Sequence, residues 1–595
     1  MTREFSEGIK KEQDNLTQKN KAFLIAGYVK LMLVILLCIG VYFLFQKKLE
    51  TGLLVLDLLG LLMLIVVSIY QGKLQEKIQY SQGIIQINQR YLDRINGTWS
   101  EFQDVGEEFK DPNHPYACDL DIVGKKSIFQ LLNTTNTWYG RKAFAEDLLD
   151  SSYSRQEIQL RQAAVEELRG KVQLGNRMEY YTSKIGKDPR IEQLVLELQD
   201  REAVIRTRGL KWLLSLFPMI TVGVLVWMSI SNTTALLYLG LGCILLHGVV
   251  LIAGKPRLKK YLSTAQHLSN KLGAYREAMS VVEEQEFTSE KLQKMKQKLG
   301  TPTGEAQQAI RKLGRIAKCL SVKNNELLYV LLNLFFLWDY QCAFLLEGWK
   351  KNYAGEVKTW FLMMGELESL ISFSNLGKIC NRTCLPEILK EEGRLAGEEL
   401  GHPLLNNTVR VTNSLKMKDN IFIISGSNMS GKTTFLRTVG INLVLGQAGG
   451  FVCAESMEFS KVKIMTSMRI ADDLNQGIST FYAELKRIRA IMEVAKTRRD
   501  LIFLIDEIFR GTNSVDRMSG ARAVLEKLKE LGVMGIITTH DLELCSLEEQ
   551  YSGIKNYSFS EYYEAQKICF DYKMNPGKST VTNGKYLMEL VGILG

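Results

Sequence analysis

The sequence has few of the residues from which metal sites and disulfide frameworks are built. Its five histidines are spread over 595 residues without ligand spacing, so we expect no histidine-based metal site. Its ten cysteines are scattered, the closest pair being Cys380 and Cys384, and no paired CxxC arrangement occurs. This pattern argues against a zinc site and against a secreted disulfide scaffold, and it favours a reducing compartment.

The sequence also lacks a strong excess of charge of one sign. The 75 basic and 65 acidic residues give a formal net charge of +10. A mild basic excess fits a phosphate-rich partner, an anionic lipid surface or the basic flanks of membrane segments, and it does not choose among them. A chain of 595 residues is too long for one hydrophobic core, so several domains are expected.

Long apolar runs, by contrast, are frequent in the first half of the chain. Four are long enough, at about 1.5 Å per residue, to cross a hydrocarbon core of about 30 Å. They form two pairs with short turns, Ala22–Phe45 with Leu53–Tyr70 and Trp212–Ile230 with Ala235–Ala253. We therefore expect two transmembrane helical hairpins. No small-residue cleavage site follows the first run, so a removable signal peptide is not expected.

The basic flanks of these runs predict the orientation. Lysines precede the first hairpin, and the basic segment Lys255–Lys260 follows the second, whose turn is uncharged. By the positive-inside rule we expect a multi-pass protein of the cell (inner) membrane with the N-terminus, the C-terminus and the middle segment in the cytoplasm. Lys47 and Lys48, in the first turn, run against this rule. Lys30 and Asp57 lie within the runs and are interpreted as tolerated charges rather than as an ion pathway.

A fifth apolar run, Leu327–Trp349, contains Asn333, Asp339 and Gln341. An acid near the bilayer midplane costs about 2.5–3.5 kcal/mol, so we interpret this run as a buried helix of a soluble domain. Before it, apolar residues recur at intervals of three and four, which predicts a long amphipathic helix. Soluble helical structure is therefore expected after the second hairpin.

The strongest chemical signal lies between Ile421 and Thr434. A strand-like run leads into Gly426, Ser427, Asn428, Met429, Ser430, Gly431, Lys432 and Thr433, the G-x4-G-K-[ST] pattern, and then into Thr434 and an apolar-periodic helix. The backbone N–H groups of such a loop surround nucleotide phosphates at a helix N-terminus. We expect Lys432 to reach the β- and γ-phosphates and the Thr433 hydroxyl to ligate Mg²⁺.

Two further strands supply the groups of a hydrolase. From Gly401 onward, short apolar runs alternate with helical stretches, as in a mostly parallel α/β sheet. The apolar run Leu501–Glu507 ends in two acids, so Asp506 is expected to hold Mg²⁺ and Glu507 to activate water. The run Gly535–His540 places His540 at the carboxyl end of its strand, as a sensor of the γ-phosphate.

These segments resemble the ATPase domain of the MutS family of DNA mismatch-repair proteins. The resemblance is carried by "GSNMSGKTTFLRTVGINLVLGQAGGFVCAESMEF", "ADDLNQGISTFYAEL", "LIDEIFRGTNSVD" and "TTHDLEL", in the family's order. Upstream, Ser127–Leu149 and Arg161–Leu168 are similar to the start of the family's helical core. The resemblance implies ATP and Mg²⁺ as cofactors and an ATPase that works as a homodimer.

The resemblance also assigns residues that the motifs alone do not. It implies that Ser479 and Thr480 reach across the dimer to the partner's γ-phosphate, and that Asn513, Ser514 and Asp516 lie at the dimer seam. No LSGGQ signature of a transporter ATPase occurs in the sequence.

The sequence departs from the family pattern in four respects. Ser427 and Ser430 replace a proline and a glycine of the loop, and Asn406–Leu415 lacks the aromatic residue that commonly stacks on adenine, so selectivity for ATP over GTP stays open. The first hairpin occupies the place of the mismatch-reading domain, and the second lies where the family inserts its lever and clamp helices. Mismatch reading is therefore not expected.

The expected protein has multi-domain α and α/β architecture. Its segments are 1–80 (tail and transmembrane hairpin 1), 81–205 (helical core), 206–258 (transmembrane hairpin 2), 259–400 (helical lever and core) and 401–595 (P-loop α/β ATPase domain, cytoplasmic). The leading hypothesis is a membrane-anchored dimeric ATPase that moves helical arms, with the lipid bilayer and duplex or branched DNA as partners. An ATP-driven transporter or membrane-remodelling motor and an ATP-switched scaffold that does not bind DNA stay open as alternatives.

Overall fold

The computed structural model describes residues 2–46, 51–150, 152–200, 203–205, 207–231, 234–299, 305–469, 480–509, 513–564 and 567–579. The chain divides into two compact units. The first comprises Met1–Gln103, Gly377–Asn381 and Leu404–Arg410, and the second comprises Asp104–Leu376, Arg382–Pro403 and Val411–Gly595. The five segments predicted from the sequence cut the chain differently and stay predictions.

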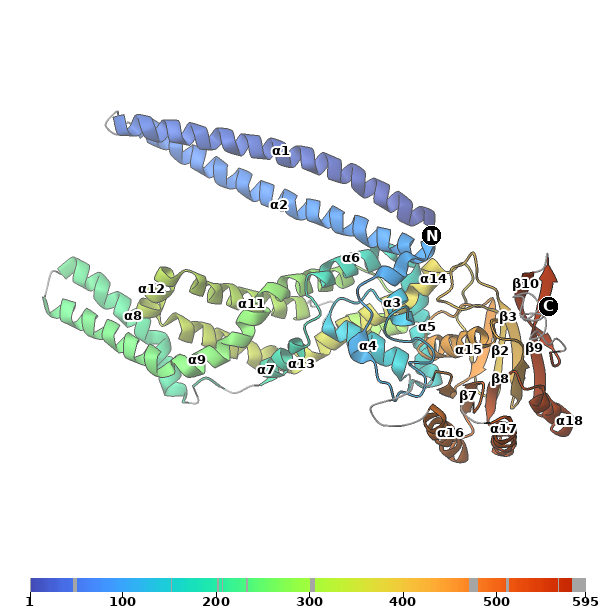
Figure 1. The fold of residues 1–595 in the computed structure, drawn as a ribbon. Helices are drawn as coiled ribbons and strands as arrows, with labels where there is room; N and C mark the ends of the chain where they lie inside the picture. Colours follow the sequence, from blue (N-terminus) through green and yellow to red (C-terminus); the bar gives the residue numbers. More distant parts are fainter. Residues whose placement is uncertain are drawn as a thin grey trace. The chain divides into compact units, whose positions relative to one another are not determined.

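The first unit is built on a long antiparallel helical hairpin of α1 (Thr2–Gln46) and α2 (Thr51–Asn96) (Figure 1). At the end that holds the N-terminus, the rings of Phe5 and Tyr91 stack with centroids 4.6 Å apart. The hydroxyl of Ser81 donates to the Glu12 carboxylate at 2.6 Å and accepts from the Lys19 ammonium at 2.7 Å. Aromatic and polar contacts therefore join α1 to α2 at this end. The apolar runs predicted for the first hairpin lie in the other half of the two helices.

The second unit begins with a helical region that contains both short and very long helices (Figure 1). These are α3 (Ile128–Leu132), α4 (Trp138–Leu149), α5 (Arg155–Gly170), α6 (Val172–Ser183), α7 (Arg190–Gln199), α8 (Arg208–Ser231), α9 (Thr234–Glu283), α10 (Glu290–Lys298), α11 (Glu305–Leu320), α12 (Glu326–Phe336) and α13 (Trp338–Ser374). The short helix α14 (Leu376–Ile379) starts at the last residue of this segment, and its other residues belong to the first unit. Helix α9 has 50 residues and is continuous from the second apolar hairpin through the predicted amphipathic helix.

Helix α13 connects the two ends of this helical region. Its first turns pack beside α8 and α9, and its last turns lie in the core against α4 (Figure 1). There the buried carboxylate of Glu368 accepts hydrogen bonds from the backbone N–H of Asn136, at 2.8 Å, and from the hydroxyl of Thr137. A single rigid helix therefore joins the core to the second hairpin.

Among the residues that the structure describes, four helices are long and apolar enough to cross a membrane, by length and composition, or five if the bent pair α12 and α13 counts as one span. The spans are Thr2–Leu44, Thr51–Asn96, Arg208–Met228 and Tyr238–His267. Their apolar stretches are largely exposed in the single chain; for example, Met219 is 71 % exposed and Ile252 is 76 % exposed. These helices include the four predicted runs.

The fifth apolar run is not the single buried helix that we predicted. It breaks at Leu337, which has a left-handed backbone (φ 48°, ψ 47°) and separates α12 from α13. The two helices meet at a bend of 78°. The α13 part is mostly buried or half-buried, but α12 exposes apolar side chains on the chain surface, including Leu327 at 74 % and Val330 at 56 %. The composition of the run alone could not distinguish a helix that is buried in protein from a helix that is exposed to an apolar partner.

The C-terminal part of the second unit contains two sheets. One has the order β1-β5-β2-β3, with β1 (Glu387–Leu389), β2 (Arg394–Leu400), β3 (Asn413–Lys418) and β5 (Ser456–Ser460). The other has the order β10-β9-β4-β8-β7-β6, with β4 (Ile421–Ser425), β6 (Lys463–Ser467), β7 (Leu501–Asp506), β8 (Met534–Thr539), β9 (Ile554–Glu564) and β10 (Lys567–Pro576). Neighbouring strands of the six-stranded sheet are parallel except β9 and β10, so the predicted parallel α/β sheet is confirmed.

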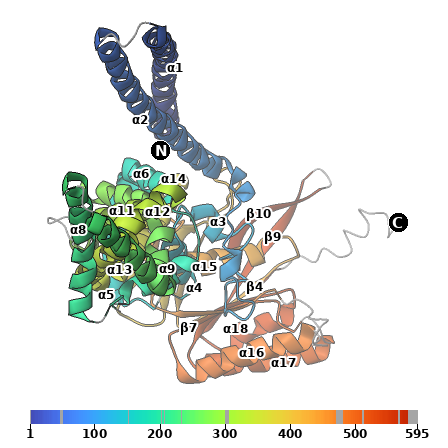
Figure 2. The same cartoon turned by 90° about the vertical axis from the view of Figure 1, so that its left-hand side faces the viewer.

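Helices cover both faces of the six-stranded sheet because its central strands are apolar on both sides. Ile423, Phe503 and Ile505 pack in one cluster with α16 (Thr480–Thr497) and α17 (Ser514–Glu530). Figure 2 shows these two helices together on one side of the sheet. On the other face lies α15 (Lys432–Gln447), whose Gly440 approaches Leu504. This layering fixes the carboxyl ends of β4, β7 and β8 beside one another.

Candidate functional site: a phosphate loop at the sheet edge

The predicted phosphate loop joins the central strand β4 to α15. Gly426 (φ 151°) and Gly431 (φ 106°) have backbone angles that favour glycine. A Cβ at Gly426 would also lie 2.6 Å from the carbonyl oxygen of Phe559. Met429 has a positive φ of 71° and a side chain that is 87 % exposed. The loop is thus a tight turn that leads into a helix N-terminus, as phosphate binding requires.

The side chain of Lys432 is held within the curve of this loop. It is buried, with 4 % exposure. Its ammonium donates to the carbonyl oxygens of Gly426 at 2.7 Å and Ser427 at 2.8 Å. A buried ammonium that is anchored by carbonyl oxygens keeps its charge close to the loop, where phosphate oxygens are bound in proteins of this type.

The groups predicted to hold Mg²⁺ meet beside the loop. The Thr433 hydroxyl donates to Asp506 Oδ2 at 2.9 Å. The hydroxyl of Thr538, at the end of β8, donates to Asp506 Oδ1 at 2.5 Å and so orients the carboxylate. One carboxylate and one hydroxyl are a sufficient protein contribution for Mg²⁺, which takes its other ligands from water and substrate phosphates. The donor set therefore fits the ion, and no group of three or more His, Cys, Asp or Glu that could hold a metal occurs among the described residues.

Glu507, predicted to activate water, and His540, predicted to sense the γ-phosphate, also lie together. Glu507 follows β7 in a left-handed conformation (φ 53°), and its backbone N–H donates to the Thr538 carbonyl at 3.1 Å. This conformation places its carboxylate Oε2 3.4 Å from Nδ1 of His540. Glu507 is 14 % exposed and His540 is 46 % exposed. The pair thus lies at the carboxyl ends of β7 and β8, where a water molecule can reach it.

Besides Thr538, three residues that contact this region were not predicted. The buried carboxylate of Glu484, on α16, accepts the backbone N–H of Phe509 two residues after Glu507. Glu561, on β9, accepts the hydroxyl of Ser427. The ring of Tyr572, on β10, would lie 3.1 Å from a Cβ on Gly431. Glu561 and Tyr572 lie on strands, and Glu484 on a helix, that are distant in sequence from the groups they approach, so only tertiary packing brings them here.

The two serines that depart from the family pattern have different environments. Ser427 is tied to Glu561, so a side-chain hydrogen bond stands where a proline would otherwise stiffen the loop. Ser430 is 1 % exposed, and its hydroxyl has no hydrogen-bond partner among the described residues. Asn428, Met429 and Thr434 are exposed at the loop surface.

The structure of a single chain does not test the residues predicted to act across a dimer. Ser479 lies outside the described residues, and Thr480 is the first residue of α16, with its side chain also outside the description. Asn513 caps α17: its Oδ1 accepts the Asp516 backbone N–H at 2.9 Å and its Nδ2 donates to the Asp516 carboxylate at 2.6 Å. Ser514 begins that helix and is exposed. A capping role within the chain is compatible with a seam role.

An ionic cluster connects the region of the loop to the turn at residues 117–122. Arg437 of α15 and Arg469 after β6 both pair with the Asp121 carboxylate, Arg437 at 2.8 Å. Arg487 of α16 pairs at 2.7 Å with Asp119, which is completely buried. We refer to these five residues as the Asp119 cluster. The helix that follows the loop and the helix that follows the predicted trans segment are therefore both tied to one turn of the helical region.

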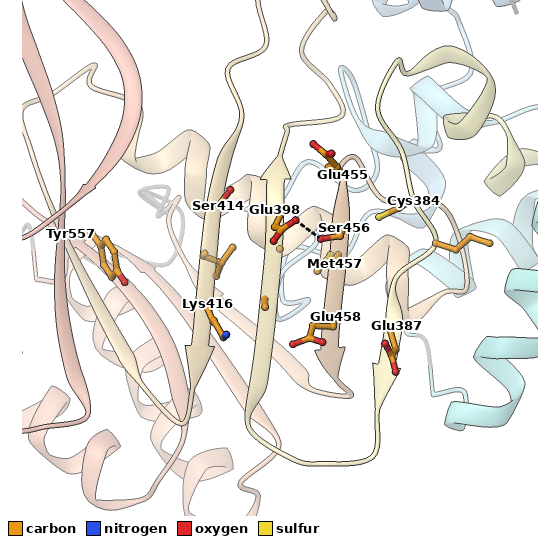
Figure 3. A pocket seen from close by; sticks show the side chains of 14 residues that line it. Cys384, Glu387, Glu398, Ser414, Lys416, Glu455, Ser456, Met457, Glu458 and Tyr557 are labelled. Atoms are coloured by element: carbon orange, nitrogen blue, oxygen red, sulfur yellow. Dashed lines mark hydrogen bonds between the residues drawn. The ribbon is translucent and has the colours of Figure 1, made fainter.

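A cavity of about 700 Å³ lies on the four-stranded sheet, and Tyr557 of β9 also lines it (Figure 3). Its charged lining residues are Glu387, Glu398, Lys416, Glu455 and Glu458. Four carboxylates and one ammonium would repel phosphate groups, so this cavity is not a second nucleotide site.

Comparison with known proteins gives a consistent result for the C-terminal domain. A family model described as MutS domain V matches residues 422–593. The DNA mismatch repair protein MutS of Halalkalibacterium halodurans is 30 % identical over 251 residues, 41 % of this chain and 29 % of that protein. That of Carboxydothermus hydrogenoformans is 35 % identical over 201 residues, 32 % of this chain and 24 % of that protein. The similarity thus spans less than a third of the length of these relatives.

Proposed function

Because the C-terminal domain of this chain belongs to the MutS family, we propose that the protein is a membrane-anchored, dimeric ATPase that binds ATP with Mg²⁺ and couples its hydrolysis to movement of the helical region. The observation that carries this proposal is the meeting of Lys432, the Thr433–Asp506 pair and the Glu507–His540 pair at one sheet edge. Phosphate-binding, metal-binding and water-activating groups occur together there.

Each group has a role that its position supports. The loop N–H groups and Lys432 would hold the phosphates, and Thr433 and Asp506 would hold Mg²⁺, which neutralises charge on phosphates when it is bound. Glu507 accepts a hydrogen bond or a proton from the attacking water, and His540 lies beside it to contact the γ-phosphate. Tyr572 offers an aromatic surface next to the loop and is our candidate for contact with the base, a role that the sequence left unassigned.

Replacement of Glu507 by Gln tests the hydrolytic role. The change keeps the size of the side chain and removes the base, so ATP binding is retained while turnover falls by about 100- to 10,000-fold. Glu549→Gln, an exposed acid of α18 (Leu547–Gln550), serves as the control and keeps the wild-type rate. Unchanged turnover in the Glu507→Gln protein would remove this residue from the catalytic role.

Movement of the helical region is proposed from the Asp119 cluster. Helices α15 and α16 both begin at or beside groups assigned to nucleotide contact, and both reach one turn of the helical region through Arg437 and Arg487. A shift of either helix on ATP binding would therefore pull on the turn at residues 117–122, and α13 would carry the shift along its length.

The membrane location is proposed from the four long apolar helices and their exposed side chains. Helices with such surfaces need an apolar solvent or an apolar partner. Membranes from cells that express the chain should retain it after washing with sodium carbonate at high pH, and only detergent should release it. Release by carbonate would contradict the transmembrane assignment.

The shared active site of the dimer can be tested with two single variants. Lys432→Ala should damage the site of the chain that carries it, and Ser479→Ala the site of the partner. A mixed dimer would then concentrate both defects in one composite site and leave the other intact, with up to about half the activity of the wild-type dimer if the sites act independently. Absence of restored activity in tagged heterodimers would argue against sites that are shared and independent.

DNA is proposed as a partner by relation to the MutS proteins, without mismatch reading. Helix α11 offers the best surface for it, since its apolar residues are buried while Arg311, Arg315 and Lys318 are exposed. Binding of duplex or branched DNA should weaken as salt rises, because contacts to phosphates release counterions. No binding at low salt would favour the motor or the scaffold without DNA.

A further inference from the structure

The short helix α12 exposes apolar side chains around most of its surface. Its sequence is ELLYVLLNLFF. Among the described residues of this helix, only the polar residue Asn333 is buried. Exposed apolar residues occur along the whole helix, namely Leu327 (74 %), Leu328 (44 %), Val330 (56 %), Leu331 (42 %) and Phe336 (43 %). In a surface helix of a water-soluble protein, the apolar residues would be buried and the polar residues would be exposed. The surface of α12 is therefore made for contact with an apolar phase.

A series of contacts fixes the position of α12 along the α8–α9 hairpin. Lys211, near the start of α8, pairs with Glu347 of α13 at 2.8 Å. Closer to the hairpin turn, Gln341 Nε2 donates to the Leu214 carbonyl at 3.2 Å. Followed from its C-terminal to its N-terminal end, α13 thus runs along α8 toward the hairpin turn. The N-terminal end of α13 therefore lies closest to that turn.

The last contacts of this series are made by α12 itself. His247, completely buried within the apolar part of α9, donates from Nδ1 to the Leu334 carbonyl at 2.7 Å. Nε2 of the same ring lies 3.4 Å from the hydroxyl of Thr221 on α8. Thr221 is ten residues beyond Lys211, which corresponds to about 15 Å along the helix. Figure 1 shows α12 beside the middle of the hairpin, and both α8 and α9 continue past it.

Two of the polar residues that argued against membrane insertion, Asn333 and Asp339, are paired within the α12–α13 break. The hydroxyl of Tyr329 donates to the Asp339 carboxylate at 2.5 Å. The Asn333 side chain donates to the Tyr329 carbonyl at 3.2 Å and accepts the Asp339 backbone N–H at 3.0 Å. Because these groups satisfy one another inside the bend, the break can lie in an apolar surrounding. Lys323, exposed three residues before α12 begins, is long enough to reach lipid headgroups.

We propose that α12 is a membrane-contacting element that lies among the lipid acyl chains beside the α8–α9 hairpin, roughly crosswise to α13. This inference rests on the proposed insertion of α8 and α9, since a helix bonded to the middle of their apolar part enters the bilayer with them. The bend of 78° at Leu337 sets α12 across the direction of α13. A single helix, α13, then leads from α12 to the core residue Glu368.

Lipid-phase photolabelling of the native protein tests this proposal without any substitution. The full chain is reconstituted in phosphatidylcholine–phosphatidylglycerol vesicles, and an apolar diazirine dissolved in the acyl chains is photolysed. Mass spectrometry should then find adducts on Leu327, Val330 and Leu331, as on Met219 and Trp227 of α8. Val515 of α17 is 75 % exposed, as Leu327 is, and should carry none because it faces water or the dimer seam.

The outcomes separate this inference from the proposed membrane location. Adducts on α8 without adducts on α12 would overturn the inference, because α12 would then be covered by protein or lie in water. Adducts on neither helix would contradict the membrane location itself. Hydroxyl radicals generated in the aqueous phase supply the complementary measurement: modification of α12 to the extent seen on Val515 would place it in water and also overturn the inference.

Discussion

The Asp119 cluster allows the strength of the connection between the ATPase domain and the helical region to be calculated and tested. The Asp119 carboxylate is completely buried and accepts four hydrogen bonds. The donors are the Thr466 hydroxyl (2.6 Å), the backbone N–H groups of Met468 (3.2 Å) and Arg469 (3.0 Å), and the Arg487 guanidinium (2.7 Å). Asp119→Asn replaces one accepting oxygen by a donating NH₂ group and removes the charge that faces Arg487.

The expected loss follows from these contacts. A hydrogen bond to a charged group contributes about 1.5–3 kcal/mol, and the substitution removes at least one acceptor. Arg487 is 28 % exposed, so water can solvate it in part and the loss stays below that of a fully buried pair, about 3–5 kcal/mol. We therefore expect Asp119→Asn to destabilise the protein by about 2–4 kcal/mol. The transition that contains the ATPase domain should melt several degrees lower in calorimetry of the full chain in detergent.

A double-mutant cycle with Arg487→Ala isolates the pair. The coupling free energy should be about 1–3 kcal/mol, because the two residues touch directly and share a buried environment. Arg498→Ala, an exposed arginine of the same domain that pairs with Asp500, is the control and should add to Asp119→Asn without coupling. A coupling below about 0.5 kcal/mol for the Arg487 cycle would refute the reasoning that the cluster connects α16 to the helical region.

Three further predictions concern single side chains. Thr538→Val removes the hydroxyl that orients Asp506 and should lower kcat/KM for ATP by about 10- to 100-fold, with a higher Mg²⁺ requirement in steady-state assays; an unchanged Mg²⁺ dependence would contradict this. Tyr572→Ala should weaken ATP binding, as measured by fluorescent-nucleotide titration, while Tyr572→Phe should not; equal binding by both would remove the ring from the site. Burial raises the pKa of the Glu368 carboxyl above 4.5, so its contribution to stability is complete below pH 4.5 and declines as pH rises through the higher folded-state pKa. Glu368→Gln should abolish that part of the pH dependence of unfolding, and an unaltered pH profile would show that the carboxyl does not cause it.

The sequence determined those features that depend on neighbours along the chain. The order of strand, loop and helix around Lys432 follows from local apolar runs and glycines, and β7 ends at Asp506 as its pattern predicts. His540 follows directly on β8, which ends at Thr539. Long apolar helices were predictable for the same reason, since length and composition are properties of a single segment.

Tertiary structure decided which distant residues complete the site. Thr538, Glu484 and Glu561 reach the loop or its neighbours because strands and helices far apart in sequence pack together. Thr538 and Glu484 lie within segments that resemble the MutS family, but the residues around them in sequence do not show that they bond to Asp506 and to the backbone of Phe509.

Tertiary structure also decided the environment of the fifth apolar run. Its composition is equally compatible with burial in protein and with contact to lipid, since both surroundings exclude water. The left-handed turn at Leu337 and the hydrogen bond from His247 to Leu334 place α12 on the surface of the α8–α9 hairpin. The polar groups of Asp339 and Asn333 are paired only in that bent geometry, because three-dimensional proximity, and not sequence, satisfies them.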